Sequence, residues 1–259
     1  PSVQTCACTT DLERGKPLQD MTDVLQGTQA GKKFSAAIFC HSLNELWQDA
    51  DGRIEKRTAV IEQVLDDYME ENALLILCEP AQTQSSRELI AVRDALLSRR
   101  SGLDLIAPCV SAGVPCPALL QGAGSSCHAE EGWEPVEPSR SLAEAAGLDR
   151  QSIKMAYFVF RKGARRPPSQ ETDLTGGCFT ARIVSDAMLN KGGRIRFVLC
   201  DGTKRFSLSA KKGDAIAEKK GFWKLRRGKT LRVRGAERRG EDGRPSFAVT
   251  EATEITILS

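Results

Sequence analysis

Three cysteines are spaced along one irregular stretch of the chain in a way that suits a soft metal. Cys109, Cys116 and Cys127 are separated by six and ten residues, among prolines and glycines that disfavour a regular helix or strand. Such a loop can wrap three thiolates around one face of a metal centre. A tetrahedral zinc ion or a cubane iron–sulfur cluster needs a fourth ligand. Spacing leaves three candidates for it: Cys200, Cys178 and His128.

The cysteine count argues for metal ligands and against disulfides. The chain has nine cysteines, an odd number, and it does not open with a charged-then-apolar leader. We therefore expect neither a disulfide framework nor secretion, and clustered thiols in a reducing compartment more often bind metal. Cys40 and Cys78 lie inside apolar, strand-like runs, and we expect both to be small residues of the core.

A basic stripe near the end of the chain could hold a polyanion. Residues 219–239 contain ten Lys and Arg in 21 positions, with two aromatic residues among them. Charges that contact phosphates, beside an aromatic ring that stacks on a base, are typical of barrel-type RNA binders. The alternative is a solvated basic face in which Trp223 only covers the barrel core. The residues expected to bind RNA are Lys219, Lys220, Trp223, Lys224, Arg226, Arg227, Arg232 and Arg234.

The charge is divided between the two parts of the chain. Residues 1–160 hold 14 Lys and Arg against 23 Asp and Glu, a net charge of −9. Residues 161–259 hold 23 against 11, a net charge of +12. This asymmetry favours an acidic front domain and a basic rear domain that binds nucleic acid. No apolar run approaches the ~20 residues that cross a bilayer, so we expect no membrane partner.

The periodicity of the front part predicts alternating strands and helices. Apolar runs indicate strands at 34–40, 74–77, 103–107 and 155–161, with a weaker one at 3–9. Helical spacing indicates helices at 53–71 and 85–100, the second capped by Ser85. Strands that alternate with helices predict an α/β domain over residues 1–162 with a parallel, doubly wound, Rossmann-like sheet. The Cys-rich loop 108–138 interrupts it.

The rear part has the texture of a small barrel. A Gly- and Pro-containing linker is predicted at 163–177, and a basic domain at 178–259. Strands are expected at 179–184, 194–200, 204–208, 230–235, 246–250 and 254–258, with hairpin turns at 201–202 and 241–243. Short strands in this number suit an OB-like β-barrel.

Several motifs of the front part resemble those of one protein family. They are Ser42-Leu43-Asn44-Glu45-Leu46, Glu79-Pro80, Arg93, Ile106-Ala107-Pro108-Cys109, Cys116-Pro117, Cys127-His128 and Tyr157. Together they resemble the methyltransferase-like family of mitochondrial and bacterial small-ribosomal-subunit proteins. The resemblance implies a partial methyltransferase fold, a [4Fe–4S] cluster on Cys109, Cys116, Cys127 and Cys200, and a role in small-subunit assembly or translation through rRNA. It also implies residence in a bacterial cytoplasm or a mitochondrial matrix.

Methyl transfer itself needs a pocket that the sequence does not display. A Gly-rich turn after the first strand normally approaches S-adenosylmethionine, and none precedes Phe34. We therefore expect weak or no binding of S-adenosylmethionine and assign no catalytic residue. Asn44 and Glu45, in the turn after a strand, are the candidates for contacting that cofactor. Two alternatives stay open: an active S-adenosylmethionine-dependent rRNA methyltransferase, and a zinc-bearing RNA-binding module.

Overall fold

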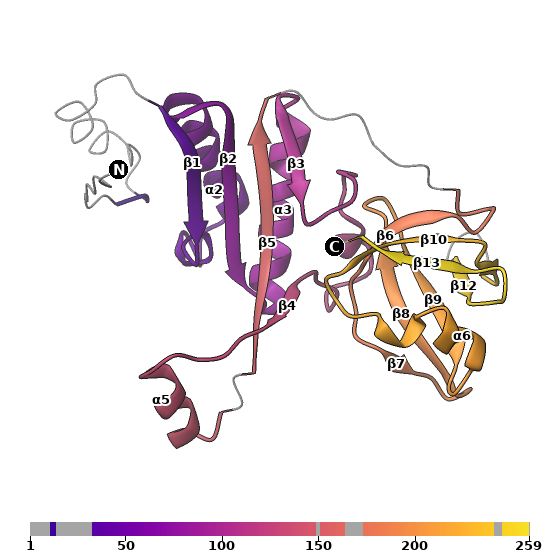
Figure 1. Cartoon of the computed structure of the whole chain (residues 1–259). Coiled ribbons are helices and arrows are strands. Elements are labelled where there is room, and N and C mark those ends of the chain that lie inside the picture. Colours follow the sequence, from indigo (N-terminus) through magenta and orange to yellow (C-terminus); the bar gives the residue numbers. More distant parts are fainter. Residues whose placement is uncertain (1–10, 14–32, 149–150, 164–172, 241–244, 259) are drawn as a thin grey trace, which may run out of the picture.

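The computed structural model of the chain describes residues 11–13, 33–148, 151–163, 173–240 and 245–258. Within these ranges the chain forms one sheet backed by helices and a second sheet that curls into a barrel (Figure 1). The first sheet ends at residue 162 and the barrel begins at residue 179. The strand predicted at 3–9 lies outside the described residues, as does the turn at 241–243. No helix of the described ranges is long and apolar enough to span a membrane.

The first sheet has five strands, four of which follow the order β1-β2-β5-β3, while β4 pairs with the first residues of β5. The strands are β1 (Phe34–Cys40), β2 (Met69–Pro80), β3 (Leu103–Ala107), β4 (Ala129–Gly132) and β5 (Ser152–Lys162). Two long helices connect the first three strands: α2 (Arg53–Gln63), which continues as the π turn η2 (Val64–Tyr68), and α3 (Thr83–Arg99). A short 3₁₀ turn, η1 (Leu43–Glu45), follows β1.

The prediction of a parallel sheet was right for β1 and β2 and wrong for β5. β1 and β2 run parallel, but β5 lies between β2 and β3 and is antiparallel to both. The reason is the way in which the chain reaches β5. It arrives from β4, which pairs antiparallel with β5. A parallel pair would need a crossover connection, and an antiparallel pair does not.

The core of this part lies between the sheet and its two long helices. In β2, Leu75 and Leu77 are fully buried, and they pack with Leu89 and Leu96 of α3. Their alternation follows from the two-residue period of a strand, which sends every second side chain toward the helices. α2 and α3 both lie behind the strands in Figure 1, so the described helices cover one face of the sheet and do not form the doubly wound arrangement that was predicted.

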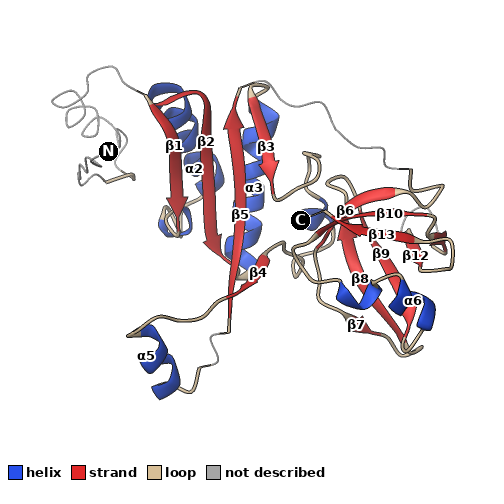
Figure 2. Cartoon of the chain, viewed as in Figure 1, coloured by secondary structure: helices blue, strands red, loops and turns tan. Residues whose placement is uncertain are grey.

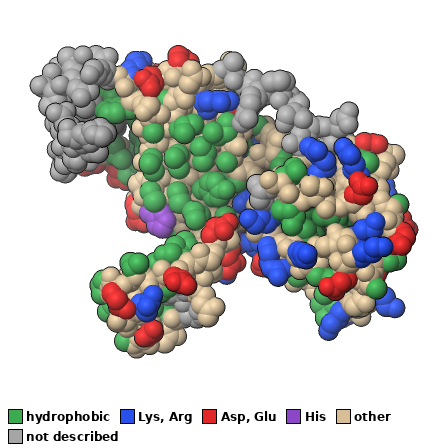
Figure 3. All heavy atoms as spheres, viewed as in Figure 1, with side chains coloured by type: hydrophobic (Ala, Val, Ile, Leu, Met, Phe, Trp, Pro, Cys, Tyr) green, Lys and Arg blue, Asp and Glu red, His purple; other side chains and the backbone are tan. Residues whose placement is uncertain are grey.

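The other face of the sheet is open in the described structure. The side chain of Ile38 in β1 is 65% exposed although it lies in the middle of the strand. Ile38 is paired in register with Ile76 of β2, which is paired with Val159 of β5. Apolar side chains therefore form a row across this face, and Figure 3 shows hydrophobic atoms gathered over these strands.

Several element boundaries differ from the prediction; for example, β2 and β5 extend beyond the strands predicted at 74–77 and 155–161. α3 begins at Thr83, two residues before the predicted cap Ser85. The helix predicted at 53–71 ends at Tyr68, because the chain turns there into β2. The loop 108–138 is not wholly irregular: it contains the short helix α4 (Pro117–Leu120) and β4. A further helix, α5 (Ser139–Ala145), projects from the sheet between β4 and β5.

The barrel follows the order β11-β12-β9-β8-β6-β10-β13, with β7 paired to β8 (Figure 2). Its strands are β6 (Phe179–Ile183), β7 (Met188–Leu189), β8 (Arg194–Cys200), β9 (Arg205–Lys211), β10 (Thr230–Arg234), β11 (Glu237–Arg238), β12 (Ser246–Ala248) and β13 (Glu254–Ile257). Between β9 and β10 lie α6 (Ala215–Lys219) and the 3₁₀ turn η3 (Phe222–Lys224).

The strand order shows that this sheet closes on itself in the OB manner. β10 and β11 are separated by only two residues, yet β11 lies at one end of the order and β10 near the other. The sheet must therefore curl so that one continuous segment reaches both edges. A three-strand meander (β6, β8, β9) is followed by the helix α6 and then by β10 to β13, of which β12 runs parallel to β9; this arrangement gives an OB-like barrel. The prediction for this part is confirmed in outline.

An aromatic cluster fills the barrel. The ring centroids of Phe179 and Phe206 lie 4.8 Å apart, edge to face, and Phe247 lies 4.8 Å from Phe179. All three side chains are buried. Aromatic pairs in this arrangement add about 0.5–1.5 kcal/mol beyond the burial of their area. The barrel therefore has a core of its own.

Candidate metal centre and basic surface

The four predicted metal ligands come from different elements and meet at one place. Cys109 follows β3, Cys116 precedes the first residue of α4, Cys127 lies just before β4, and Cys200 is the last residue of β8 in the barrel. Cys116 is buried, and the other three are partly buried. The first three belong to the loop of the α/β part, so the group joins that part to the barrel.

The thiols of this group affect one another's pKa. Burial raises the pKa of Cys109 to about 12; Arg93 opposes that shift, and Cys127, Cys200 and Cys116 add to it. Burial raises the pKa of Cys200 to about 11, and Cys127 and Cys116 again contribute. Because interactions between charges weaken with distance, these mutual effects indicate that the four thiols are neighbours.

Three arginines surround this group. The side chain of Arg93 is 1% exposed; burial raises the pKa of Cys109 and of Cys116, and the charge of Arg93 opposes that rise at both thiols. Arg182 of β6 places its Nη1 atom 3.9 Å from the Sγ atom of Cys127. Arg205, at the start of β9, likewise opposes the rise that burial causes in the pKa of Cys200. Positive charge therefore faces the thiols from both parts of the chain.

Two of these arginines carry buried donors without a partner. Arg93 donates from Nη1 to Gly113 O, at 2.6 Å, and to the carboxylate of Asp94, but its Nε–H meets no acceptor among the described residues. The Nε–H of Arg205 is unpartnered in the same sense. A buried N–H group without an acceptor is unfavourable by roughly 1–3 kcal/mol. A ligand that carries acceptors would relieve both.

The loop and the barrel are held together beside the cysteines. The Nη1 atom of Arg205 donates to Ser125 Oγ at 2.8 Å, and its Nη2 atom donates to the carbonyl oxygen of Ser126 at 2.8 Å. Gly113 of the loop and Gly202 of the β8–β9 turn also touch through their backbones. Ser126 precedes Cys127 and Gly202 follows Cys200 by two residues, so both contacts hold the loop to the barrel next to a predicted ligand.

The two other candidates for the fourth ligand are Cys178 and His128. Cys178 is at the entrance of the barrel, where its thiol faces Gly176 O at 3.7 Å. His128 has a partly buried ring, and burial first, then Arg227 and Lys154, lower its pKa. Mutual effects on pKa link Cys200 to the loop thiols.

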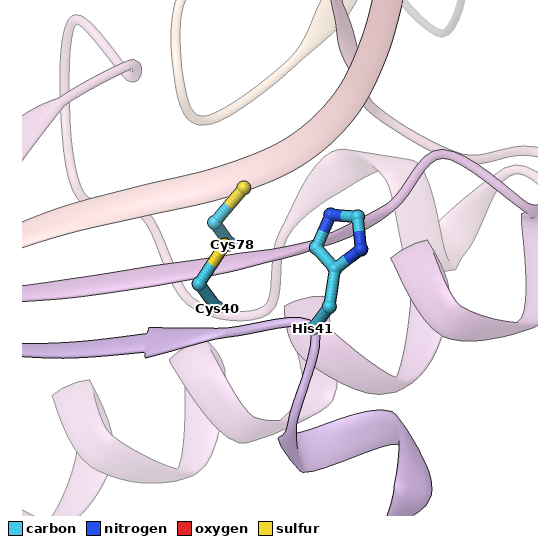
Figure 4. A group of neighbouring side chains, drawn as sticks. All are labelled: Cys40, His41 and Cys78. Atoms are coloured by element: carbon cyan, nitrogen blue, oxygen red, sulfur yellow. The ribbon is translucent and has the colours of Figure 1, made fainter. Parts of the chain in front are cut away.

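The expectation that Cys40 and Cys78 are core residues was wrong. Cys40 is exposed and Cys78 is partly exposed, because they lie on the open face of the sheet. Their sulfur atoms and a ring nitrogen of His41 all lie within 4.8 Å of one another (Figure 4). An apolar strand pattern predicts burial only if both faces of the sheet are covered, and here the described helices cover one.

Asn44 and Glu45 bond to each other. The Nδ2 atom of Asn44 donates to Glu45 Oε1 at 2.6 Å, and Gln48 donates to Glu45 Oε2 at 2.9 Å. The carbonyl oxygen of Asn44 accepts from the buried Arg57. These contacts stabilise the turn η1 and give neither side chain a described link to a cofactor pocket. The neighbouring Glu79 also has a structural role, because it accepts from the backbone N–H of Leu43 at 2.8 Å.

The positively charged residues predicted to bind RNA differ in their exposure to solvent. Lys219, Lys224, Arg226, Arg232 and Arg234 are exposed, while Lys220 and Arg227 are partly buried. Arg232 and Arg234 alternate with buried residues of β10 and share one face, as predicted.

Two residues of the basic stripe have structural tasks instead. Arg227 forms two hydrogen bonds with the carboxylate of Asp186, at 2.8 and 3.2 Å, and a third with Val184 O. Trp223 packs on the barrel core, with its ring 4.9 Å from that of Phe222 in an edge-to-face arrangement. The alternative in which Trp223 covers the core therefore fits the structure better than a free stacking platform.

The structure adds cations that the stripe did not include. Arg196 of β8 and Lys211 of β9 are exposed, and Lys211 is paired in register with Arg194 of β8. Alternation in the run 194–200, with Arg at 194 and 196 between apolar residues, was the signal that could have found them. In Figure 3, Lys and Arg side chains are spread over the visible side of the barrel.

Comparisons with known proteins place this chain in no family. No family model matches it, and no curated protein matches it. Among solved structures, a p202 HIN2 domain superposes with a TM-score of 0.25 at 10% identity, covering 32% of this chain and 40% of that chain. A replication factor A related protein from Methanobacterium thermoautotrophicum gives 0.26 at 16% identity, covering 36% and 94%.

A third structure, the Ifi202 HINa domain in complex with 20 bp dsDNA, gives a TM-score of 0.24 at 12% identity, covering 45% of this chain and 74% of that chain. This chain thus spans less than half of the p202 HIN2 chain. Scores of this size are too low to support an argument about either fold or function. The OB-like description of the barrel consequently rests on its own strand order.

Proposed function

We propose that this chain binds a [4Fe–4S] cluster through Cys109, Cys116, Cys127 and Cys200 and acts, without catalysing a reaction, in small-ribosomal-subunit assembly by binding rRNA. The observation that carries the proposal is that four thiols neighbour one another although they come from two parts of the chain with separate hydrophobic cores. A group bound there would tie the barrel to the α/β part. The motifs described above, which resemble a family of small-subunit proteins, supply the ribosomal part of the proposal.

The surroundings of the thiols fit a cluster. Four thiolates are unfavourable in a buried site unless metal and positive charge compensate for them. Arg93, Arg182 and Arg205 supply the charge, and Arg93 and Arg205 each have a buried Nε–H group without an acceptor among the described residues. Hydrogen bonds to the sulfurs are among the features that set the potential of such clusters. When bound, the cluster would supply a covalent link between the loop and β8.

We favour a cluster over a single zinc ion for these four thiols. Tetrahedral Zn–S bonds of about 2.3 Å bring the sulfur atoms to within about 3.8 Å of one another. Among the described residues, the one group of three Cys, His or carboxylate ligands that lies within 4.8 Å is Cys40, His41 and Cys78. No three of the four loop and barrel cysteines form such a group. A cubane places four irons between its thiolates, so it does not require so close a group of sulfur atoms.

Nucleic-acid binding is supported by the type and charge of the barrel. OB-like barrels bind oligonucleotides on the outer face of their second and third strands. Here those strands are β8 and β9, which carry exposed Arg196 and Lys211, and the exposed Arg232 and Arg234 lie on β10. The net charge of +12 over residues 161–259 points the same way. Phosphate contacts by such residues give affinity without needing a defined sequence.

A pair of single substitutions tests the cluster assignment. We expect Cys200→Ser in the full chain, purified without oxygen, to lose the iron and the brown colour of the parent. Cys178→Ser is the matched control and should keep both, because its thiol faces Gly176 O. If Cys178→Ser loses the iron and Cys200→Ser retains it, the proposed ligand set is wrong.

A further inference from the structure

A second group of metal-binding side chains lies at the carboxyl ends of the two parallel strands. Cys40 is the last residue of β1, and it is paired in register with Cys78 of β2. Residues paired across neighbouring strands point to the same face of a sheet, so both thiols project from the open face. The carboxyl ends of parallel strands are where α/β sheets most often bind ligands.

His41 completes the group through an unusual backbone conformation. Its φ is +51°, in the left-handed region that non-glycine residues rarely adopt, and its backbone N–H donates to Cys78 O at 2.9 Å. The reversal of direction brings the imidazole back to the thiols, as Figure 4 shows, so that the three ligand atoms lie within 4.8 Å of one another. Strained residues of this kind gather at functional sites.

The group is accessible and borders a cleft. Cys40 and His41 are exposed. A cleft of about 850 Å³ is lined by His41 together with Glu130, Trp133 and Lys154, among others. A ligand bound at the group would thus face a space that could admit a small molecule or a water. The group differs in this respect from the enclosed site of the four cysteines.

The ligand types indicate the metal. Two thiolates and one imidazole bind zinc in sites that keep a fourth position for water or substrate. The distance of about 3.8 Å between tetrahedral zinc ligands can be reached from 4.8 Å by small rotations of side chains that are largely free to move. Met155, whose sulfur lies 3.8 Å from Cys78 Sγ, adds an apolar, polarisable wall.

We propose that Cys40, His41 and Cys78 bind one zinc ion, with its fourth position open to the cleft at the end of the sheet. This site is independent of the proposed cluster, since it lies on other elements and uses none of its cysteines. Its open position would allow the zinc ion to bind a water or a small molecule from the cleft as its fourth ligand.

The test uses the full chain, reduced and kept without oxygen, with the four-cysteine site already loaded with iron. Zn²⁺ is titrated against a chromophoric chelator, and Co²⁺ replaces it in a second series to report thiolate ligation by its charge-transfer bands. We expect one equivalent of Zn²⁺ to bind beyond the iron. Cys40→Ser, Cys78→Ser and His41→Asn should each weaken that binding by more than about 100-fold, since even outer contacts of a metal site are worth 10–100-fold.

Controls separate this site from the cluster and from misfolding. Asn tolerates a left-handed backbone, so His41→Asn removes the imidazole without adding strain. Cys178→Ser should bind Zn²⁺ as the parent does, and all three ligand variants should keep the iron and the melting temperature of the parent. If the reduced parent binds no zinc beyond the iron site, the proposal is wrong. Zinc binding that survives both Cys40→Ser and His41→Asn would equally overturn it.

Discussion

Gly113 and Gly202 approach each other so closely that neither has room for a side chain. A Cβ atom on Gly113 would lie 2.4 Å from the carbonyl oxygen of Gly202, and a Cβ atom on Gly202, whose φ is +94°, would lie 2.4 Å from Ser111 O. Gly113 lies between two loop cysteines, and Gly202 follows Cys200 by two residues. The contact therefore sets how far the barrel stands from the loop.

Gly113→Ala should separate the barrel from the loop. The added methyl group must displace backbone rather than a flexible side chain, which is unfavourable by about 1–3 kcal/mol. We expect a lower midpoint in urea and a partial loss of iron per chain. Gly124→Ala is the control, because nothing lies within 4 Å of its added Cβ. Equal iron content in the two variants would mean that the contact does not position Cys200.

Removal of two exposed cations from β10 should weaken RNA binding. If Arg232 and Arg234 contact phosphates, their joint replacement by Ala lowers the slope of log affinity against log salt by about 1.4 for single-stranded RNA. The measurement is fluorescence anisotropy with a labelled small-subunit rRNA fragment over a range of salt concentrations. Replacing Lys56 and Arg99 of the α/β part with Ala removes the same charge and should leave the slope unchanged. An unchanged slope in the β10 variant would mean that Arg232 and Arg234 are solvated and do not contact RNA.

Trp223→Ala should affect the stability of the fold and spare affinity. The ring packs against Phe222 and the barrel core, so its loss destabilises the chain by about 3 kcal/mol. Trp223→Phe should recover most of that loss. Chemical denaturation and RNA titration of the same samples distinguish the two roles. A variant that unfolds like the parent but binds RNA about tenfold more weakly would instead assign the ring to base stacking.

Glu88 should make the stability of the fold depend on pH in the acid range. Burial opposes its ionisation, but hydrogen bonds from Arg57, Gln84 and Arg53 outweigh that effect and lower its pKa below the ordinary 4.5. A carboxyl whose pKa is lowered by folding stabilises the fold above its unfolded pKa, and that contribution disappears as the pH falls through the folded value.

We therefore expect Glu88→Gln to be less stable than the parent at pH 7, by about 2–4 kcal/mol, since Arg57 is left buried without its carboxylate. The difference between the two proteins should shrink below pH 4. Urea unfolding at several pH values measures it, with Glu62→Gln as a control whose partner Arg99 is exposed. A difference that stays constant down to acid pH would contradict the assignment.

The parts of the fold that follow from local periodicity could be read from the sequence. The apolar run at 34–40 and the helical stripe of α3 need no distant partner to be recognised. The direction of β5 could not be read, because it is set by pairing with β4, a strand of four residues without an alternating pattern. Pairing between segments distant in sequence leaves little trace in either one.

The candidate sites also contain residues that the sequence alone identified and residues that only the fold brings together. The loop cysteines could be found by their residue type, whereas Cys200 was assigned from the family resemblance alone, and the fold brings it beside Arg205 and the loop. The group of Cys40, His41 and Cys78 was missed because it depends on which face of the sheet the helices cover. Arg227 was predicted to bind RNA, and no sequence pattern showed that Asp186 engages it.

The central claim is that the four cysteines hold one [4Fe–4S] cluster, and metal analysis of the unmodified chain tests it most directly. The chain is purified without oxygen, and its iron, acid-labile sulfide and zinc are measured beside its visible absorption spectrum. Our account predicts a brown protein with about four irons and four sulfides per chain. A colourless protein with about one zinc per chain, retained in Cys40→Ser and lost in Cys200→Ser, would contradict it.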